Sequence, residues 1–230
     1  MTLATWLSPA YPIGAYSWSH GLETLVAQNA VHDPGSLERW IADVLAYGAG
    51  RTDAVLLARA YRAAADPAAL DDIAALARAL TPSRERSRET NAQGAAFDRV
   101  TAAAWAPDLR AGAGTGAATH AAAGPGQDPA EQALPYPVAV GRAAGQAGIA
   151  LDMVLAMAMQ AMATNLISAG IRLIPIGQTD GQRVLASLHP VCRQVAAAAA
   201  AEGAALGGSA ILTDIAAMQH ETLRVRLFQS

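Results

Sequence analysis

The sequence predicts an all-α fold, a single-domain multi-helix bundle with a long central buried helix and a flexible insertion rich in Gly, Ala and Pro. Of the 230 residues, 58 are alanine, the strongest helix former, whereas only 11 are aromatic. No run of four or more residues shows the period of two that a half-buried strand requires. Helix start signals, in contrast, recur along the whole chain.

The helices of the first half are predicted from capping residues followed by apolar periodicity. A helix is expected after Ser17 or Ser19, and it would place His20 and Glu23 three residues apart. Asp33-Pro34 is typical of an N-cap and a first helical position, and Asp66-Pro67 repeats that signal. The apolar face that follows Asp33 comprises Leu37, Trp40, Ile41, Val44 and Leu45. Further helices are expected over residues 52–65 and from Pro82 to about Trp105.

The second half predicts four more helices. They are expected over residues 135–148, 151–174, 182–201 and 209–222, and Pro175 must end or bend the second of them. The last of the four is expected to pack Ile211, Ile215 and Met218 against the core.

The stretch from residue 153 to residue 171 has no charged side chain and is long enough to cross a bilayer. Gln160, Thr164 and Ser168 recur every four positions with Asn165 beside them, so they form one polar stripe on an apolar helix. This pattern favours a helix buried in a soluble protein, where the stripe would find hydrogen-bond partners.

Residues 107–135 differ in composition from everything around them, with several Gly and Pro and no apolar periodicity. Both flanking halves have the same helical character, and no repeat of fixed period is found. We therefore predict one domain over residues 1–230, interrupted by an insertion at 107–134.

Composition excludes several classes of function. The net charge of −3 argues against nucleic acid as a partner. All 16 basic residues are arginine, so the lysine of a phosphate-binding loop is missing, and no G-x-S-x-G motif occurs. A single cysteine, Cys192, allows no internal disulfide, and the first residues show no signal-peptide pattern. A cytoplasmic protein without a membrane segment is expected.

Two motifs could carry metal or acid–base chemistry. His20 and Glu23 suit proton transfer or metal binding, which suggests a metal-dependent hydrolase that also uses His189. His189 and Cys192 form H-x-x-C, which with the methionines of residues 153–162 suggests a direct nickel-binding protein. Each motif also has a structural explanation, namely a capped helix start and a buried thiol beside a satisfied histidine.

Two polar stretches exceed what packing alone requires. Residues 177–182, GQTDGQ, follow the long apolar helix and suit a tight turn. Residues 220–228, HETLRVRLF, place charge beside Leu and Phe on a terminal segment, and such residues are favoured at interfaces.

Several stretches together are similar to one protein family. Residues 7–23, LSPAYPIGAYSWSHGLE, resemble the amino-terminal signature of the UreF family of urease accessory proteins. Residues 177–182 and 220–228 resemble two further landmarks of that family in the same order, and residues 88–94 and 165–169 add weaker matches. The resemblance covers nearly the whole chain apart from the insertion.

The resemblance implies a non-enzymatic, usually dimeric all-α chaperone that helps to load nickel into urease. Such proteins bind UreD, called UreH in some systems, and recruit the GTPase UreG onto apo-urease. The GTPase would handle nickel and GTP, so no cofactor or metal is expected on this chain, and GTP hydrolysis would be coupled to nickel insertion.

The resemblance also implies which residues contact partners. The sequence departs from the family pattern at two positions: Gln219 and Gln229 stand where family members commonly carry arginine. The implied partner-binding residues come from the signature, the turn and the tail: Tyr16, Ser17, His20, Glu23, Gln178, Thr179, Asp180, Gln182, Glu221, Arg224, Arg226 and Phe228.

Overall fold

The computed structural model describes residues 1–112 and 133–229, with the backbone alone described at 106–112. In that part of the chain every regular element is a helix, which confirms the predicted all-α class. The elements are α1 (Thr2–Trp6), the 3-10 helix η1 (Ala15–Ser17), α2 (Leu22–Ala27), α3 (Pro34–Tyr47), α4 (Ala49–Arg62), α5 (Pro67–Ala79), α6 (Arg84–Gly112), α8 (Tyr136–Gln146), α9 (Leu151–Leu173), α10 (Gln178–Ala200) and α11 (Ile211–His220).

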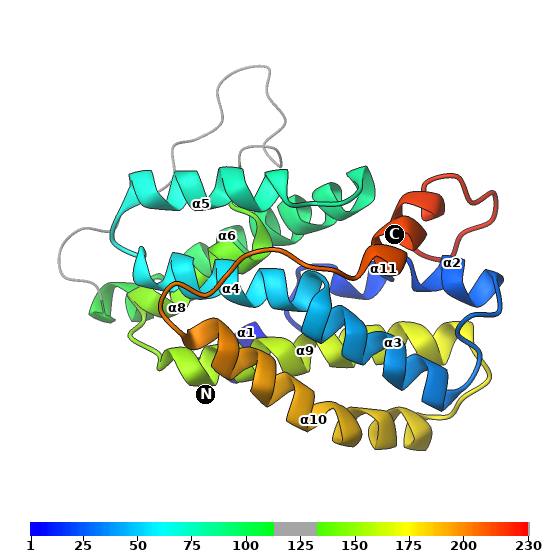
Figure 1. Ribbon diagram of the computed structural model, residues 1–230. Coiled ribbons are helices and arrows are strands. Elements are labelled where there is room, and N and C mark those ends of the chain that lie inside the picture. Colours follow the sequence, from blue (N-terminus) through cyan, green and yellow to red (C-terminus); the bar gives the residue numbers. More distant parts are fainter. Residues whose placement is uncertain (113–132, 230) are drawn as a thin grey trace.

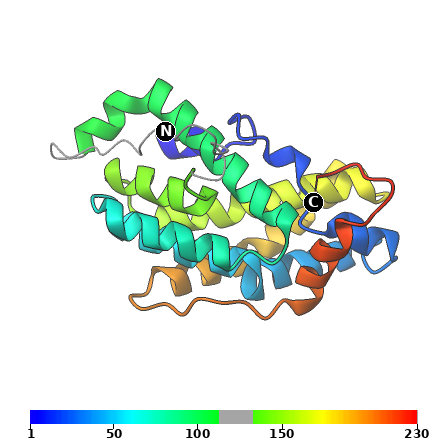
Figure 2. The same ribbon diagram turned by 90° about the horizontal axis from the view of Figure 1, so that it is seen from above.

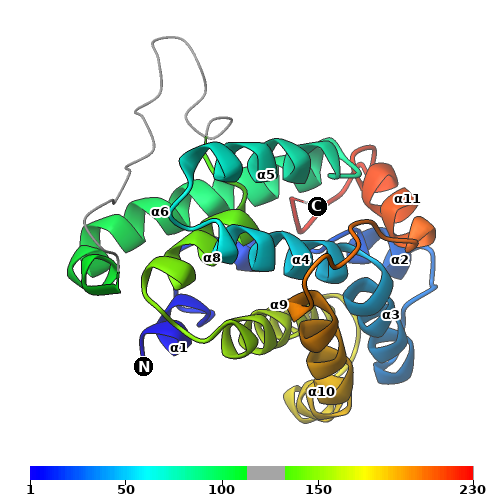
Figure 3. The same ribbon diagram turned by 60° about the vertical axis from the view of Figure 1, so that its left-hand side comes forward.

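The helices surround α4, which packs against α3, α5, α8, α9 and α10 (Figures 1 and 3). Helices α9 and α10 form a pair below it, and α6 packs against α8 on the opposite side. Helix α11 lies at one end of the bundle against α2 and α6. The carboxyl-terminal tail, residues 221–229, follows α11 and lies at that same end (Figure 2).

The two clearest start signals in the sequence are confirmed. The Asp33 carboxylate accepts a hydrogen bond from Ser36 N at 2.7 Å at the start of α3, with Pro34 in the first turn. Asp66 accepts from Ala69 N at 3.1 Å at the start of α5. These caps satisfy amide groups that a helix leaves without partners, so both helices begin where the sequence predicts.

Helices α8 and α4 cross at backbone contact. A Cβ atom added at Gly141 would overlap the Leu57 carbonyl oxygen, and one added at Gly145 would lie 2.5 Å from the Tyr61 carbonyl oxygen. Because the two glycines are four residues apart, they share one face of α8. This glycine face lets α8 approach α4 more closely than any side chain would allow.

Helix α9 is the long apolar helix that the sequence predicts, but its burial is one-sided. It is long and apolar enough to cross a membrane by length and composition, and 44% of its most apolar 18-residue window is buried inside the bundle. The prediction that its polar stripe is buried was wrong, because Gln160 and Ser168 are exposed and Thr164 is half-buried.

Two predicted boundaries differ from the observed ones. Helix α10 begins at Gln178, so the predicted turn at residues 177–182 is mostly the first turn of this helix. The Gly177 amide donates to Asp180 Oδ2 at 3.4 Å, which supports that early start. Helix α6 continues to Gly112, so the first residues of the predicted insertion are helical. Residues 113–132 of the insertion lie outside the described part of the chain.

The packing predicted for α11 was wrong. Its large apolar side chains Ile211, Ile215 and Met218 are exposed, whereas Ala216 and Ala217 are buried. The cause is close approach, since a Cβ atom added at Gly21 would lie 2.6 Å from Ala217 N. Only small side chains fit between α11 and the segment that carries Gly21, so the larger apolar residues point outward.

Candidate functional site

His20 and Glu23 do not share a helix face, contrary to the sequence prediction. His20 and Gly21 both have positive φ values, 55° and 80°, and α2 begins only at Leu22. Two successive left-handed residues break the helical relation between positions 20 and 23. As a result, Glu23 faces α11 and the tail, whereas His20 faces α6.

Glu23 is the acceptor that holds the carboxyl-terminal tail. Its Oε1 accepts from Leu227 N at 2.7 Å, and its Oε2 accepts from Phe228 N at 3.0 Å. The same Oε2 lies 3.1 Å from His220 Nε2. One carboxylate thus satisfies two tail amides and a histidine of α11, which links three segments that are distant in sequence.

Glu85 of α6 completes this arrangement from the other side. Its Oε2 lies 2.7 Å from His220 Nδ1, and its Oε1 accepts from Arg226 Nη1 at 2.6 Å. His220 is fully buried between the two carboxylates. We call Glu23, Glu85, His220 and Arg226 the tail clamp.

The end of the tail is anchored by Phe228. This side chain is 4% exposed, and the Arg172 guanidinium lies 4.2 Å from the centroid of its ring. Arg172 also donates to the Tyr16 carbonyl oxygen at 2.6 Å, and Gln229 N donates to the Ser17 carbonyl oxygen at 2.8 Å. The tail therefore packs directly on the amino-terminal segment.

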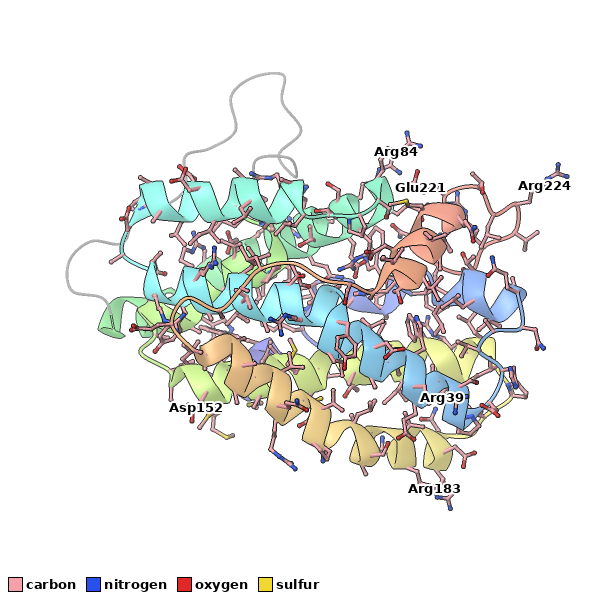
Figure 4. The ribbon with its side chains drawn as sticks, viewed as in Figure 1. Arg39, Arg84, Asp152, Arg183, Glu221 and Arg224 are labelled. Carbon is pink, nitrogen blue, oxygen red and sulfur yellow. The ribbon has the colours of Figure 1, made fainter. Side chains whose placement is uncertain are left out.

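The remaining predicted partner-binding residues lie at the surface. The Tyr16 side chain is 70% exposed, and Arg224 is exposed and points away from the bundle (Figure 4). Glu221 lies beside Arg84 and accepts from Arg84 N at 2.8 Å.

The predicted partner-binding residues of α10 are also at the surface. Gln178, Thr179 and Gln182 are exposed, and Asp180 pairs with Arg183 at 2.8 Å. Among the bonds described, none joins these α10 residues to the tail.

His20 belongs to a second, buried polar group that the sequence did not reveal. Its Nε2 lies 2.7 Å from Arg86 Nη1 and 3.1 Å from Glu89 Oε1. Arg86 also pairs with Glu89 directly and lies 4.0 Å from Asp53 Oδ2. Gln93 donates to Glu89 Oε1 at 3.0 Å. We call His20, Asp53, Arg86, Glu89 and Gln93 the buried polar network.

Burial and one cation set the charges of the buried polar network. Burial lowers the pKa of His20, and the charge of Arg86 lowers it further. Burial alone would raise the pKa of Glu89, but Arg86 and His20 outweigh it and bring this pKa to about 2. Burial raises the pKa of Asp53 to about 6 despite Arg86. One arginine therefore serves two carboxylates, and Asp53 is the less compensated of them.

The buried polar network lies between two cavities. A cavity of about 70 Å³ is lined by His20, Glu89 and Asp53, and one of about 260 Å³ by Asp53, Arg86 and Asp214. Asp53 and Arg86 line both cavities.

Part of this polar arrangement could have been predicted from the sequence. The four-residue spacing of Glu85, Glu89 and Gln93 places them on one face of α6, but nothing in the sequence pointed to Asp53.

Metal chemistry finds no support in the described part of the chain, where no group of three or more His, Cys, Asp or Glu is placed to hold an ion. His20, Glu23 and His189 are not brought together. Cys192 is buried, and burial raises the pKa of its thiol, which makes the thiolate ligand less available. The described residues therefore do not form the His20, Glu23 and His189 site of the hydrolase hypothesis.

Replacing Asp53 with asparagine is expected to stabilise the protein at pH 7 by about 1–3 kcal/mol. The folded state binds the Asp53 proton more tightly than the unfolded state, because its pKa is raised from 3.8 to about 6. Wild-type stability should therefore fall as the pH rises from about 4 through 6, and Asp53→Asn should flatten that fall. Urea denaturation at pH 4.5 and pH 7 measures it. A variant less stable than wild type at both values would contradict the prediction.

Comparison with known proteins adds to this geometry. A family model described as UreF matches residues 31–189. A protein named urease accessory protein UreF from Cereibacter sphaeroides is 47% identical over 231 residues, covering 100% of this chain and 98% of that protein. Proteins of the same name from Rhodopseudomonas palustris and Roseobacter denitrificans are 46% and 43% identical, covering 99% and 100% of this chain and 90% and 93% of theirs.

The family model and the full-length relatives cover the residues of the tail clamp to different extents. Glu85 lies inside the range of the family model, whereas Glu23, His220 and Arg226 lie outside it. The similarity to the Cereibacter sphaeroides protein, however, spans 100% of this chain and so includes the amino-terminal segment and the tail.

Proposed function

Because this chain belongs to the UreF family of urease accessory proteins, we propose that it is a non-enzymatic chaperone of urease maturation. It bridges UreD (UreH) and the GTPase UreG on apo-urease and couples GTP hydrolysis to nickel insertion. The observation that carries this proposal is the pair of outward-facing features at one end of the bundle, the α11 face and the clamped tail.

The exposed face of α11 is proposed to bind UreD. It comprises Ile211, Leu212, Ile215 and Met218, and Tyr47 adds an exposed ring. A groove of about 400 Å³ runs between Tyr47 and the start of α11. Large apolar side chains exposed together on one helix face are typical of a protein interface.

The clamped tail is proposed to recruit UreG. The tail clamp fixes the backbone of residues 227 and 228, while Arg224 and Val225 point outward. An ordered tail binds with less entropy loss than a free one. Tyr16 lies at the same surface, because the Arg172 guanidinium bonds the Tyr16 carbonyl oxygen and covers Phe228.

A homodimer is proposed to form through the outward face of α9. This helix is apolar, but less than half of its most apolar window is buried in one copy. Met153, which is 53% exposed, begins that face. A second copy would remove the apolar surface from water.

Four residues at the start of α10 are proposed to contact UreD or UreG. They are Gln178, Thr179, Asp180 and Gln182.

The proposal assigns no cofactor or metal to this subunit. Nickel and GTP are handled by the partner complex, in the cytoplasm, where that complex would meet apo-urease. Neither nucleic acid nor membrane is a proposed partner.

Co-purification of this chain with UreD and with nickel-loaded, GTP-bound UreG tests the proposal. Leu212→Glu places a charge at a position that is 79% exposed, so we expect loss of UreD binding without loss of the fold. Truncation after Leu223 removes the anchored tail, and we expect loss of UreG with retention of UreD.

Met153→Glu is the matched control for Leu212→Glu. It adds the same charge to an exposed apolar position on another helix, and we expect loss of the homodimer with UreD still captured. Failure of the full-length chain to bind either protein would overturn the proposed function. Capture of UreD by both variants would remove α11 from the interface.

A further inference from the structure

The hydrogen-bond partners of His220 lie on both sides of its ring. Each ring nitrogen faces a carboxylate oxygen, with Nδ1 at 2.7 Å from Glu85 and Nε2 at 3.1 Å from Glu23. An ionised carboxylate only accepts hydrogen bonds, whereas a neutral imidazole has one donor and one acceptor nitrogen. Both nitrogens of His220 donate only when the ring is an imidazolium.

The other contacts of the two carboxylates also use their oxygens as hydrogen-bond acceptors. Glu85 also accepts from Arg226, and Glu23 also accepts from the amides of Leu227 and Phe228. With His220 protonated, two positive and two negative side chains balance in the tail clamp. With His220 neutral, one carboxylate faces a nitrogen lone pair inside a buried cluster that carries a net negative charge.

We propose that His220, as an imidazolium, is the positioning residue that keeps the carboxyl-terminal tail in its clamped conformation. Loss of the His220 proton costs a charge-assisted hydrogen bond to Glu23 or Glu85 and makes the two carboxylates repel each other. The tail is then released as the pH rises. This inference rests on the proposed function, because it concerns the segment that recruits UreG.

The charged groups around His220 are few among the described residues. Glu23 faces it from α2, Glu85 from α6 and Arg226 from the tail. Glu221, the first residue of the tail, is paired with Arg84 at 3.1 Å and so does not compete for the imidazolium. No described cation contacts Glu23, so the imidazolium is the positive charge on that side of the clamp.

One substitution separates the role of the proton from a merely structural role of His220. In Glu85→Gln the amide oxygen still accepts from Arg226, and the amide nitrogen donates to Nδ1 of a neutral His220. The neutral ring then donates from Nε2 to Glu23. This variant therefore completes the clamp without the extra proton, and its tail should not respond to pH.

Amide hydrogen exchange of Leu227 and Phe228 in the full-length chain measures clamping directly. Protection factors, which divide out the intrinsic pH dependence of exchange, are compared at pH 6 and pH 8.5. For wild type we expect a loss of about tenfold or more at the higher pH. Glu85→Gln should show a similar factor at both values, and His220→Gln should show low protection at both.

Nitrogen-15 spectra of labelled histidine give the second measurement. Both ring nitrogens of His220 should report protonation at pH 6. His32→Gln is the control, because His32 lies on the surface beside Asp33, and its removal should leave tail protection unchanged at each pH. A neutral His220 at pH 6, or wild-type protection that is equal at both values, would overturn the inference.

Binding of UreG at the same two pH values separates this inference from the proposed function. If the tail responds to pH as expected but UreG binds at neither value, the proposed function fails and the clamp mechanism stands. If UreG binds equally at both values while wild-type protection also stays constant, the proposed function stands and the clamp mechanism fails.

Discussion

Replacing Arg86 with methionine is expected to lower the free energy of unfolding by about 3–5 kcal/mol at pH 7. Arg86 is the cation of the buried polar network, 7% exposed, and it pairs with Glu89, bonds His20 and lies 4.0 Å from Asp53. Methionine fills similar volume without charge, so Glu89 and the partly buried Asp53 lose the cation that they share. Urea denaturation of wild type and Arg86→Met at pH 7 measures the loss.

The pH dependence of that loss checks its electrostatic origin. At pH 4.5 protonation of carboxylates in the variant lowers the negative charge that Arg86 no longer balances, so the loss should shrink. Arg183→Met is a matched control, because Arg183 pairs with Asp180 on the surface and should contribute less than about 1 kcal/mol. A loss below about 1 kcal/mol for Arg86→Met at pH 7 would mean that the carboxylates find other compensation.

Replacing Gly141 with alanine is expected to destabilise the protein by about 3 kcal/mol, against the helix propensity of alanine. Propensity alone predicts a gain of about 1 kcal/mol for glycine to alanine inside a helix. The new Cβ, however, would overlap the Leu57 carbonyl oxygen, and backbone cannot move aside as a side chain does. Helices α4 and α8 must then separate. Thermal or urea denaturation measures whether the substitution stabilises or destabilises the protein.

Gly35→Ala provides the control for Gly141→Ala. Gly35 lies in the first turn of α3, and its added Cβ would lie 3.5 Å from Arg39 Nη1 and 3.8 Å from Asp33 Oδ1, which are ordinary van der Waals contacts. The same chemical change should therefore be neutral or slightly stabilising there. Stabilisation by both substitutions would show that the crossing of α4 and α8 relaxes without cost.

The sequence predicted those features that depend on neighbours along the chain. Asp33 and Asp66 cap helices through amides three residues away, so residue order alone defines both starts. The class of fold followed from alanine content and from apolar periodicity. The family resemblance predicted partner contacts for the amino-terminal segment and the tail, and that assignment stays a prediction.

The features that the sequence missed depend on contacts between distant segments. Glu23 and Phe228 are 205 residues apart in sequence, and Asp53 and Arg86 lie on two different helices, α4 and α6. The helical placement of His20 was wrong because His20 and Gly21 both have positive φ values, at the point where α11 packs closely over Gly21. The orientation of α11 was wrong for the same reason, since amphipathic periodicity identifies an apolar face but not what covers it.

The orientation of α11 has a consequence for the amount of this subunit in a cell. Ile211 and Leu212 are 65% and 79% exposed, so a copy without its partner exposes to the solvent an apolar surface that favours association. Copies made in excess would associate with one another or attract proteases and holding chaperones. Balanced synthesis with the partner, rather than greater intrinsic stability, would then keep this chain soluble.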